Sequence, residues 1–91
     1  MPNGETQISE EGKLIGEIIH YFGKIGVAVV KLEDTLRVGD TIKITDGGTE
    51  FTQTIESMQI EHQQVQEAKA GESIGLKLNQ KVREGYKVYK L

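Results

Sequence analysis

Apolar and polar residues alternate in several short segments of the chain. Residues 41–45 alternate strictly, with Ile42 and Ile44 on one face, whereas both faces of residues 13–22 are partly apolar. Alternation with a period of two is typical of β-strands, because successive side chains of a strand point to opposite sides. The pattern predicts six strands, at residues 13–22, 25–33, 41–45, 49–61, 73–78 and 86–91.

Glycine-containing turns separate the predicted strands. Gly23-Lys24 predicts a two-residue hairpin connection, and Asp46-Gly47-Gly48 predicts a second hairpin. The chain holds 10 Ile, 7 Val and 7 Thr against 3 Ala, an excess of β-branched residues that favours strands over helices. Residues 62–70 could form one helical turn or a turn-rich loop. With no helix to cover a sheet, the sequence predicts an all-β fold, a small, mostly antiparallel, closed barrel of six strands.

The alternation changes phase within residues 49–61. Phe51 and Ile55 share one face of this segment, while Met58 and Ile60 share the opposite face. One extra residue in a strand shifts the phase in this way. We therefore expect a β-bulge at Glu56 or Ser57.

The length of 91 residues is that of one domain. Residues 1–12 carry three Glu and no basic residue, and they lack the apolar stretch of a secretory signal. We expect them to form a mobile acidic arm, followed by a single barrel domain at residues 13–91. Without a targeting signal, the expected location is the cytoplasm.

Composition and charge exclude several classes of function. The chain has no cysteine, so it has no disulfide, thiol nucleophile or zinc–thiolate site. The net charge of −3 gives no overall attraction to phosphate backbones or anionic membranes. Residues 77–91, however, hold 5 of the 11 Lys and Arg and only one acidic residue. Any contact with nucleic acid would therefore be local.

Few residues could carry catalytic chemistry. His20 and His62 are the two histidines, and no serine has the G-x-S-x-G context of a nucleophile elbow. Metal binding would need further ligands at a suitable spacing, and none is present. We therefore expect no enzymatic activity and no cofactor or metal. Tyr86-Lys87-Val88-Tyr89-Lys90 interleaves aromatic and basic residues as a base-stacking surface would, but a terminal strand with alternating core and solvent positions also explains it.

Four short segments, taken in order, resemble a known family. Gly16-Glu17-Ile18 matches a G-x-V pattern, residues 36–40 match L-k-x-G-D, and residues 68–75 match A-x-A-G-D/E-x-x-G, with Val82-Arg83-Glu84-Gly85 following. Together they resemble the second, β-barrel domain of elongation factor Tu and other translational GTPases. The chain looks closest to the small translation elongation factor-like proteins that consist of this barrel. The resemblance implies a binding or adaptor module associated with protein biosynthesis.

The resemblance does not extend to nucleotide chemistry. The phosphate-binding loop G-x-x-x-x-G-K-[ST] is absent, because Ile18 stands where the loop needs its first glycine before Gly23-Lys24. We expect no GTP binding.

The resemblance also implies a partner surface beside residues 61–72. A protein partner is favoured, because Ser73 stands where bacterial elongation factor Tu has Asn and because Lys69 is the one basic residue of the loop. RNA, either tRNA or rRNA, is the other candidate. No membrane partner is expected. The candidate binding residues are Met58, His62, Lys69, Glu72 and Ser73, with Arg37 as a second candidate position. The alternative function is that of a detached accessory barrel that works with a separately encoded enzyme, such as a peptidase or an RNA-modifying enzyme.

Overall fold

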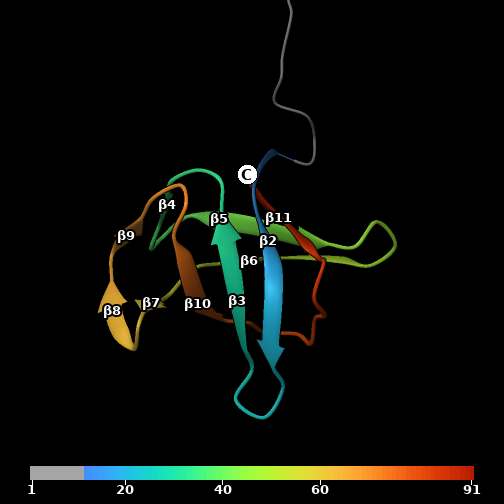
Figure 1. Cartoon of the computed structure of the whole chain (residues 1–91). Helices are drawn as coiled ribbons and strands as arrows, with labels where there is room; N and C mark the ends of the chain where they lie inside the picture. Colours follow the sequence, from blue (N-terminus) through green and yellow to red (C-terminus); the bar gives the residue numbers. More distant parts are fainter. Residues whose placement is uncertain (1–11) are drawn as a thin grey trace, which may run out of the picture.

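The computed structural model describes residues 12–91, and every regular element in them is a β-strand (Figure 1). The predicted all-β fold is confirmed, and residues 62–70 form two short strands with turns around them rather than a helical turn. The predicted acidic arm lies outside the described residues, apart from Gly12. The strands are β2 (Lys13–Phe22), β3 (Val27–Leu32), β4 (Leu36–Arg37), β5 (Thr41–Thr45), β6 (Glu50–Thr54), β7 (Met58–Ile60), β8 (Gln63–Val65), β9 (Glu67–Ala68), β10 (Ser73–Lys77) and β11 (Lys87–Lys90).

Eight strands form one sheet in the order β6-β5-β11-β2-β3-β10-β7-β8, and β4 pairs with β9 in a separate small sheet. Neighbouring strands run antiparallel, as expected. Within residues 12–91, β6 and β8 are the two edges of the large sheet and are not hydrogen-bonded to each other. The prediction of a closed six-stranded barrel is therefore wrong: the sheet is an open half-barrel that curves around the core (Figure 1).

One side chain of the edge strand β6 reaches the end of β10, a strand with which β6 does not pair. The side-chain amide of Gln53 on β6 donates a hydrogen bond of 2.9 Å to the carbonyl oxygen of Lys77. The side-chain oxygen of Gln53 accepts a second hydrogen bond, also of 2.9 Å, from the backbone N–H of Asn79. One amide group therefore links the edge strand β6 to the end of β10.

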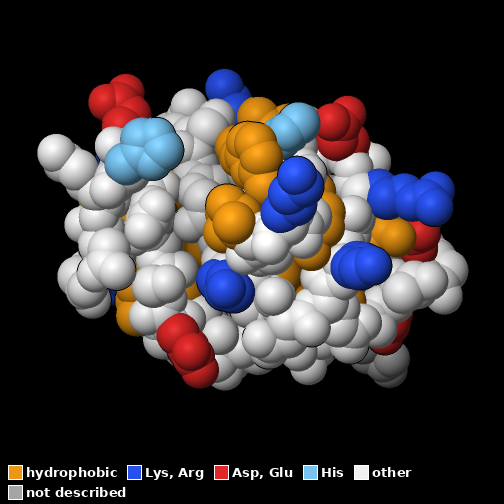
Figure 2. Space-filling view, turned by 90° about the horizontal axis from the view of Figure 1, so that it is seen from below, with side chains coloured by type: hydrophobic (Ala, Val, Ile, Leu, Met, Phe, Trp, Pro, Cys, Tyr) orange, Lys and Arg blue, Asp and Glu red, His pale blue; other side chains and the backbone are white. Residues whose placement is uncertain are grey.

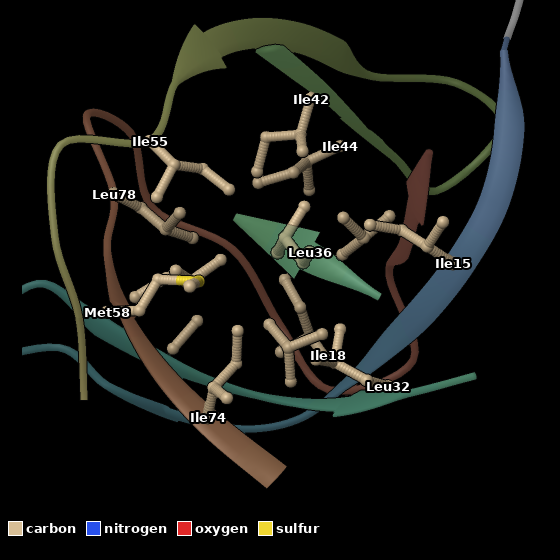
Figure 3. Packing of buried hydrophobic residues seen from close by; sticks show 14 of the residues in the cluster. Ile15, Ile18, Leu32, Leu36, Ile42, Ile44, Ile55, Met58, Ile74 and Leu78 are labelled. Atoms are coloured by element: carbon tan, nitrogen blue, oxygen red, sulfur yellow. The ribbon is translucent and has the colours of Figure 1, made fainter. Parts of the chain in front are cut away.

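The concave side of the half-barrel holds one hydrophobic core (Figure 3). Ile42 and Ile44, which share one face in the predicted alternation, are buried in it, and so are Ile74, Leu76 and Leu78. The other buried members are Ile15, Ile18, Ala28, Val30, Leu32, Leu36, Ile55, Met58, Ala68, Val82 and Val88.

The phase change in residues 49–61 is real, but a bulge is not its cause. β6 ends at Thr54 and β7 begins at Met58, so Glu56 and Ser57 lie between two strands. Ile55 pairs with a neighbouring turn, donating its N–H to the carbonyl oxygen of Asp40 at 2.9 Å and accepting from the N–H of Gly39 at 2.8 Å. The chain thus leaves the sheet for three residues, and the register shifts of the large sheet fall in β2 and β11 instead.

Two hairpin loops differ from the sequence expectation. The connection between β2 and β3 comprises residues 23–26 rather than two residues, and it ends at Gly26 with a φ of 69°. The hairpin of β7 and β8 turns at Glu61 and His62, whose φ angles of 51° and 69° are both left-handed. Two successive positive φ angles in a two-residue loop are typical of a type I′ turn.

No helix in the part of the chain that the structure describes is long and apolar enough to span a membrane.

Candidate functional site

An apolar groove lies on the outer face of β3, β10 and β7. Val29 pairs with Gly75, which pairs in turn with Gln59, so these residues lie side by side on that face. Because Gly75 has no side chain, a hollow of about 260 Å³ remains between the valines of β3 and Gln59. We call it the apolar groove; its lining residues are Phe22, Ile25, Val27, Val29, Gln59, Glu61, His62, Ser73, Ile74 and Gly75.

Two large apolar side chains form one rim of the groove. Phe22 is 47% exposed and Ile25 is 59% exposed, at opposite ends of the β2–β3 loop. The His20 ring packs edge-on against Phe22, with 4.4 Å between the ring centroids. Seen from below, hydrophobic side chains gather between the two histidines of the chain, with several Lys and Arg side chains around them (Figure 2). This end of the molecule therefore exposes apolar surface that no other described part of the chain covers.

A second hollow, of about 610 Å³, lies on the other side of the β2–β3 loop. We call it the basic pocket; it is lined by Tyr21, Gly23, Lys24, Lys81, Val82, Arg83 and Tyr86. The segment after β10 is held against the loop and β2 by three backbone hydrogen bonds. Leu78 N–H donates to the Gly26 carbonyl at 2.9 Å, Gly85 N–H donates to the Ile18 carbonyl at 2.7 Å, and Ile18 N–H donates to the Tyr86 carbonyl at 2.8 Å.

The cations of the basic pocket differ from most others in the structure. Among residues 12–91, none of Lys24, Lys81 and Arg83 has a carboxylate within ion-pair distance, and no acidic residue lines the pocket. By contrast, five other cations each pair with a carboxylate: Lys13, Arg37, Lys43, Lys87 and Lys90. The pocket therefore holds positive charge that is not neutralised locally.

A third hollow, of about 860 Å³, shares Arg83 and Tyr86 with the basic pocket and has mixed charge. In its wall, the carboxylate of Asp46 accepts hydrogen bonds from the N–H groups of Thr49 at 2.7 Å and Gly48 at 2.9 Å. These bonds, with one from the Tyr86 hydroxyl, hold the pKa of Asp46 below its usual range. Lys43 is only 8% exposed and faces Glu50 across 3.8 Å. Acids and bases thus already balance one another in this wall.

The structure brings only some of the predicted binding residues together. His62 and Ser73 both line the apolar groove. Met58 is fully buried in the core, so its side chain has no surface to offer a partner.

The other predicted residues lie outside the groove and are engaged within the chain. Glu72 accepts a hydrogen bond of 2.7 Å from the backbone N–H of Lys69 within their turn. Arg37 pairs with Glu67 at 3.0 Å across the small sheet. The predicted residues therefore do not form one surface.

Sequence reasoning missed the apolar residues and the glycine that make the groove. Two signals were available. The outer face of residues 13–22 is partly apolar, and an isolated glycine in a strand pattern, here Gly75, often marks a place where something approaches closely. Within residues 12–91, no three His, Asp or Glu side chains come close enough together to hold a metal ion.

Relatives of the chain include proteins named as peptidases. The chain is 45% identical over 80 residues to an uncharacterized protease of Methanocaldococcus jannaschii, covering 85% of this chain and 19% of that protein. It is 36% identical over 78 residues to a collagenase of Porphyromonas gingivalis, covering 84% of this chain and 22% of that protein. The chain therefore spans about a fifth of the length of these curated relatives.

Solved structures share the fold. The C-terminal domain of a Geobacillus thermoleovorans protein described as a U32 peptidase superposes with a TM-score of 0.81 at 19% identity, covering 93% of this chain and 99% of that domain. Its selenomethionine variant gives the same TM-score at 21% identity, covering 86% of this chain and 99% of that domain. An arrangement like this one therefore occurs as the terminal domain of a larger protein.

The comparisons correct the family predicted from the four short segments. The resemblance to elongation factor Tu is wrong, because the relatives are peptidases and the family model that matches is that of another β-barrel domain. The expected link to protein biosynthesis rested on that resemblance and is therefore wrong as well, whereas the choice between a protein and an RNA partner stays a prediction. The matching model covers residues 1–61, two thirds of the sequence. The chain belongs to the family of CAF17 C-terminal β-barrel domains.

Proposed function

We propose that the chain is a non-enzymatic accessory domain of the kind found in U32 peptidases, and that it binds a protein partner through the apolar groove. This is the alternative function expected from the sequence, in place of a translation adaptor. The relatives support it, because the chain aligns with only about a fifth of a protease and of a collagenase. The partner that we propose is the body of such a peptidase.

The observation that carries the proposal is the apolar groove with its exposed rim. Phe22 and Ile25 are about half exposed, on the outer face of a sheet whose core lies on its other side. An exposed apolar patch with polar groups around it is typical of a protein–protein contact. Among residues 12–91, Glu61 is the one acidic residue of the lining and no Lys or Arg lines the groove, which disfavours a phosphate backbone as the ligand. A polypeptide fits this surface better than RNA.

The arrangement of the two histidines supports a non-enzymatic role. His20 lies 3.3 Å from Glu84 and packs edge-on against Phe22, so it is held by exposed neighbours rather than beside a nucleophile. His62 and Ser73 share the groove, yet no hydrogen bond joins them. A serine nucleophile needs a base within hydrogen-bonding reach.

Calorimetry with a truncated relative tests the proposal. The probe is the Methanocaldococcus jannaschii protease without its aligned segment, titrated with the full chain, and peptide hydrolysis is followed with and without the chain. We expect binding, together with a change in the activity of the truncated protease. The chain alone is expected to cleave neither casein nor gelatin.

A variant that fills the groove provides the structural control. A Cβ atom at Gly75 would meet Cγ1 of Val27 at 3.5 Å, an ordinary contact, so Gly75→Leu fills the groove without entering the core. We expect it to weaken binding about tenfold, which corresponds to about 1.4 kcal/mol. The matched control Thr52→Leu adds apolar volume at an exposed position of β6, away from the groove, and should bind like the wild type. Absence of binding, or proteolysis by the chain alone, would overturn the proposal.

A further inference from the structure

The basic pocket joins three unpaired cations to two tyrosines at the same end of the molecule as the apolar groove. Lys24 comes from the β2–β3 loop, whereas Lys81 and Arg83 come from the segment before β11. Like charges brought together in a folded chain repel one another, and here no carboxylate of residues 12–91 compensates them by an ion pair. The pocket therefore favours an anionic ligand from outside the described residues.

The way the pocket is built indicates which anion it takes. Phosphate sites commonly use backbone N–H groups that converge from a loop or a helix N-terminus. In the β2–β3 loop, the N–H groups of Ile25 and Gly26 already donate to the carbonyl of Phe22, at 3.3 and 2.9 Å. The pocket thus offers side-chain donors around an open hollow of about 610 Å³. Such donors suit separate carboxylates along a chain, and the fork of Arg83 can bind one of them through two hydrogen bonds.

The apolar groove lies directly beside the basic pocket. Lys24 lines the basic pocket and the next residue, Ile25, lines the apolar groove. One ligand can therefore contact both hollows by crossing a single four-residue loop. A ligand that fits both must carry carboxylates beside apolar side chains.

We propose that the basic pocket binds an acidic segment of the protein partner, next to the apolar side chains that enter the groove. This inference rests on the proposed function, because it names the partner's chemistry at the same surface. The chain as a whole has a net charge of −3, so the attraction is local and acts on the orientation of the partner.

An NMR titration of the full ¹⁵N-labelled chain tests the pocket with a defined probe. The probe is a short peptide of alternating Leu and Glu; its counterpart with Lys in place of Glu and inorganic pyrophosphate are titrated in parallel. We expect the Leu/Glu peptide to shift the amide signals of residues 23–26 and 81–86, with an affinity that falls as salt is added. The Lys peptide should leave these signals unchanged.

Charge-reversal variants separate the pocket from overall charge. Lys24→Glu/Lys81→Glu should lower the affinity for the Leu/Glu peptide at least about tenfold, or about 1.4 kcal/mol. Lys31→Glu/Lys69→Glu changes the net charge equally at two exposed lysines outside the pocket and should keep the affinity within about twofold, or about 0.4 kcal/mol. Thermal unfolding of both variants verifies that they fold.

Several results would overturn the inference. One is an equal loss of peptide affinity in both double variants. Another is the absence of amide signal shifts with the Leu/Glu peptide, and a third is larger shifts with pyrophosphate than with this peptide. If the truncated protease binds the wild type and Lys24→Glu/Lys81→Glu equally well, this inference fails while the proposed function stands. If the peptide binds the pocket and the truncated protease does not bind, the acidic-ligand site stands and the proposed function fails.

Discussion

Gly16 on β2 lies so close to β3 that a Cβ atom on it would come within 2.7 Å of the carbonyl oxygen of Lys31. The same atom would lie 2.9 Å from Cγ1 of Val30, in the core. Real Cβ atoms essentially never approach backbone oxygens this closely. The two strands at the centre of the half-barrel therefore depend on the missing side chain.

Replacement of Gly16 by Ala should destabilise the fold. The added methyl group forces β2 and β3 apart, and such overpacking typically costs about 1–3 kcal/mol of unfolding free energy. Urea unfolding followed by circular dichroism measures the loss. Gly75→Ala is the matched control, because its Cβ would meet Cγ1 of Val27 at an ordinary 3.5 Å. Equal stability of the two variants would show that β2 and β3 can relax.

A turn optimised for positive φ should stabilise the protein. Glu61 and His62 adopt φ angles of 51° and 69°, which cost a residue other than glycine about 1–2 kcal/mol. Because Asn-Gly is the favoured pair for this turn, Glu61→Asn/His62→Gly should raise the unfolding free energy by about 1 kcal/mol. The same pair introduced at Glu56 and Ser57, where φ is not positive, should give no gain. A lower melting temperature of the Glu61→Asn/His62→Gly variant would contradict the prediction.

The side chain of Gln53 should hold the edge strand β6 to the end of β10. Gln53→Ala removes both hydrogen bonds of 2.9 Å and should cost about 1–2 kcal/mol. Hydrogen exchange should accelerate at the amide of Asn79, whereas amides between β2 and β3 should change little. Gln64→Ala is the control, because this exposed side chain of β8 has no hydrogen bond to any other described residue. Unchanged exchange at Asn79 would mean that the backbone holds this position without Gln53.

Low pH should destabilise the folded protein as the carboxylate of Asp46 in its hairpin becomes protonated. The N–H groups of Thr49 and Gly48 lower the pKa of Asp46 from 3.8, its ordinary value, in the folded state. A lowered folded pKa adds stability that is present above pH 3.8 and is lost as pH falls through the folded value.

The melting temperature of Asp46→Asn should therefore depend less steeply on pH below about pH 4 than that of the wild type. Glu56→Gln, which replaces a carboxylate without a hydrogen-bond or ion-pair partner among residues 12–91, should leave this slope unchanged. Parallel curves for Asp46→Asn and the wild type would show that the hydrogen bonds do not act on folding.

Alternation predicted which side chains of β5 enter the core, although Lys43 and Thr45 on its other face are also buried. Ile42 and Ile44 lie in the core as expected. The pattern could not show that the chain leaves the sheet around Ile55, because a strand break and a bulge shift the phase alike. Nor does Gln63-Gln64-Val65 alternate, so β8 could not be found in this way. Closure of the sheet depends on pairing between distant segments, about which local patterns carry no information.

The candidate site was less predictable than the fold. The apolar groove is hollow because Gly75 has no side chain. The cations of the basic pocket come from a loop near residue 24 and a segment near residue 82, which meet only in the folded chain. The four segments that suggested elongation factor Tu consist largely of residues typical of turns, such as Gly39-Asp40 and Gly71-Glu72. Turns of this kind recur in unrelated β-proteins, since many strand connections need glycine and aspartate.

The loop at residues 23–26 is a wall common to the apolar groove and the basic pocket. Lys24 and Ile25 are adjacent, so a ligand that fixes one of these side chains also restricts the backbone of the other. A ligand bound in one hollow would already have ordered the loop, so binding in the second hollow would cost less conformational entropy. Linkage makes this effect reciprocal: a partner that engages both hollows would bind with positive cooperativity, more tightly than its two halves bind separately.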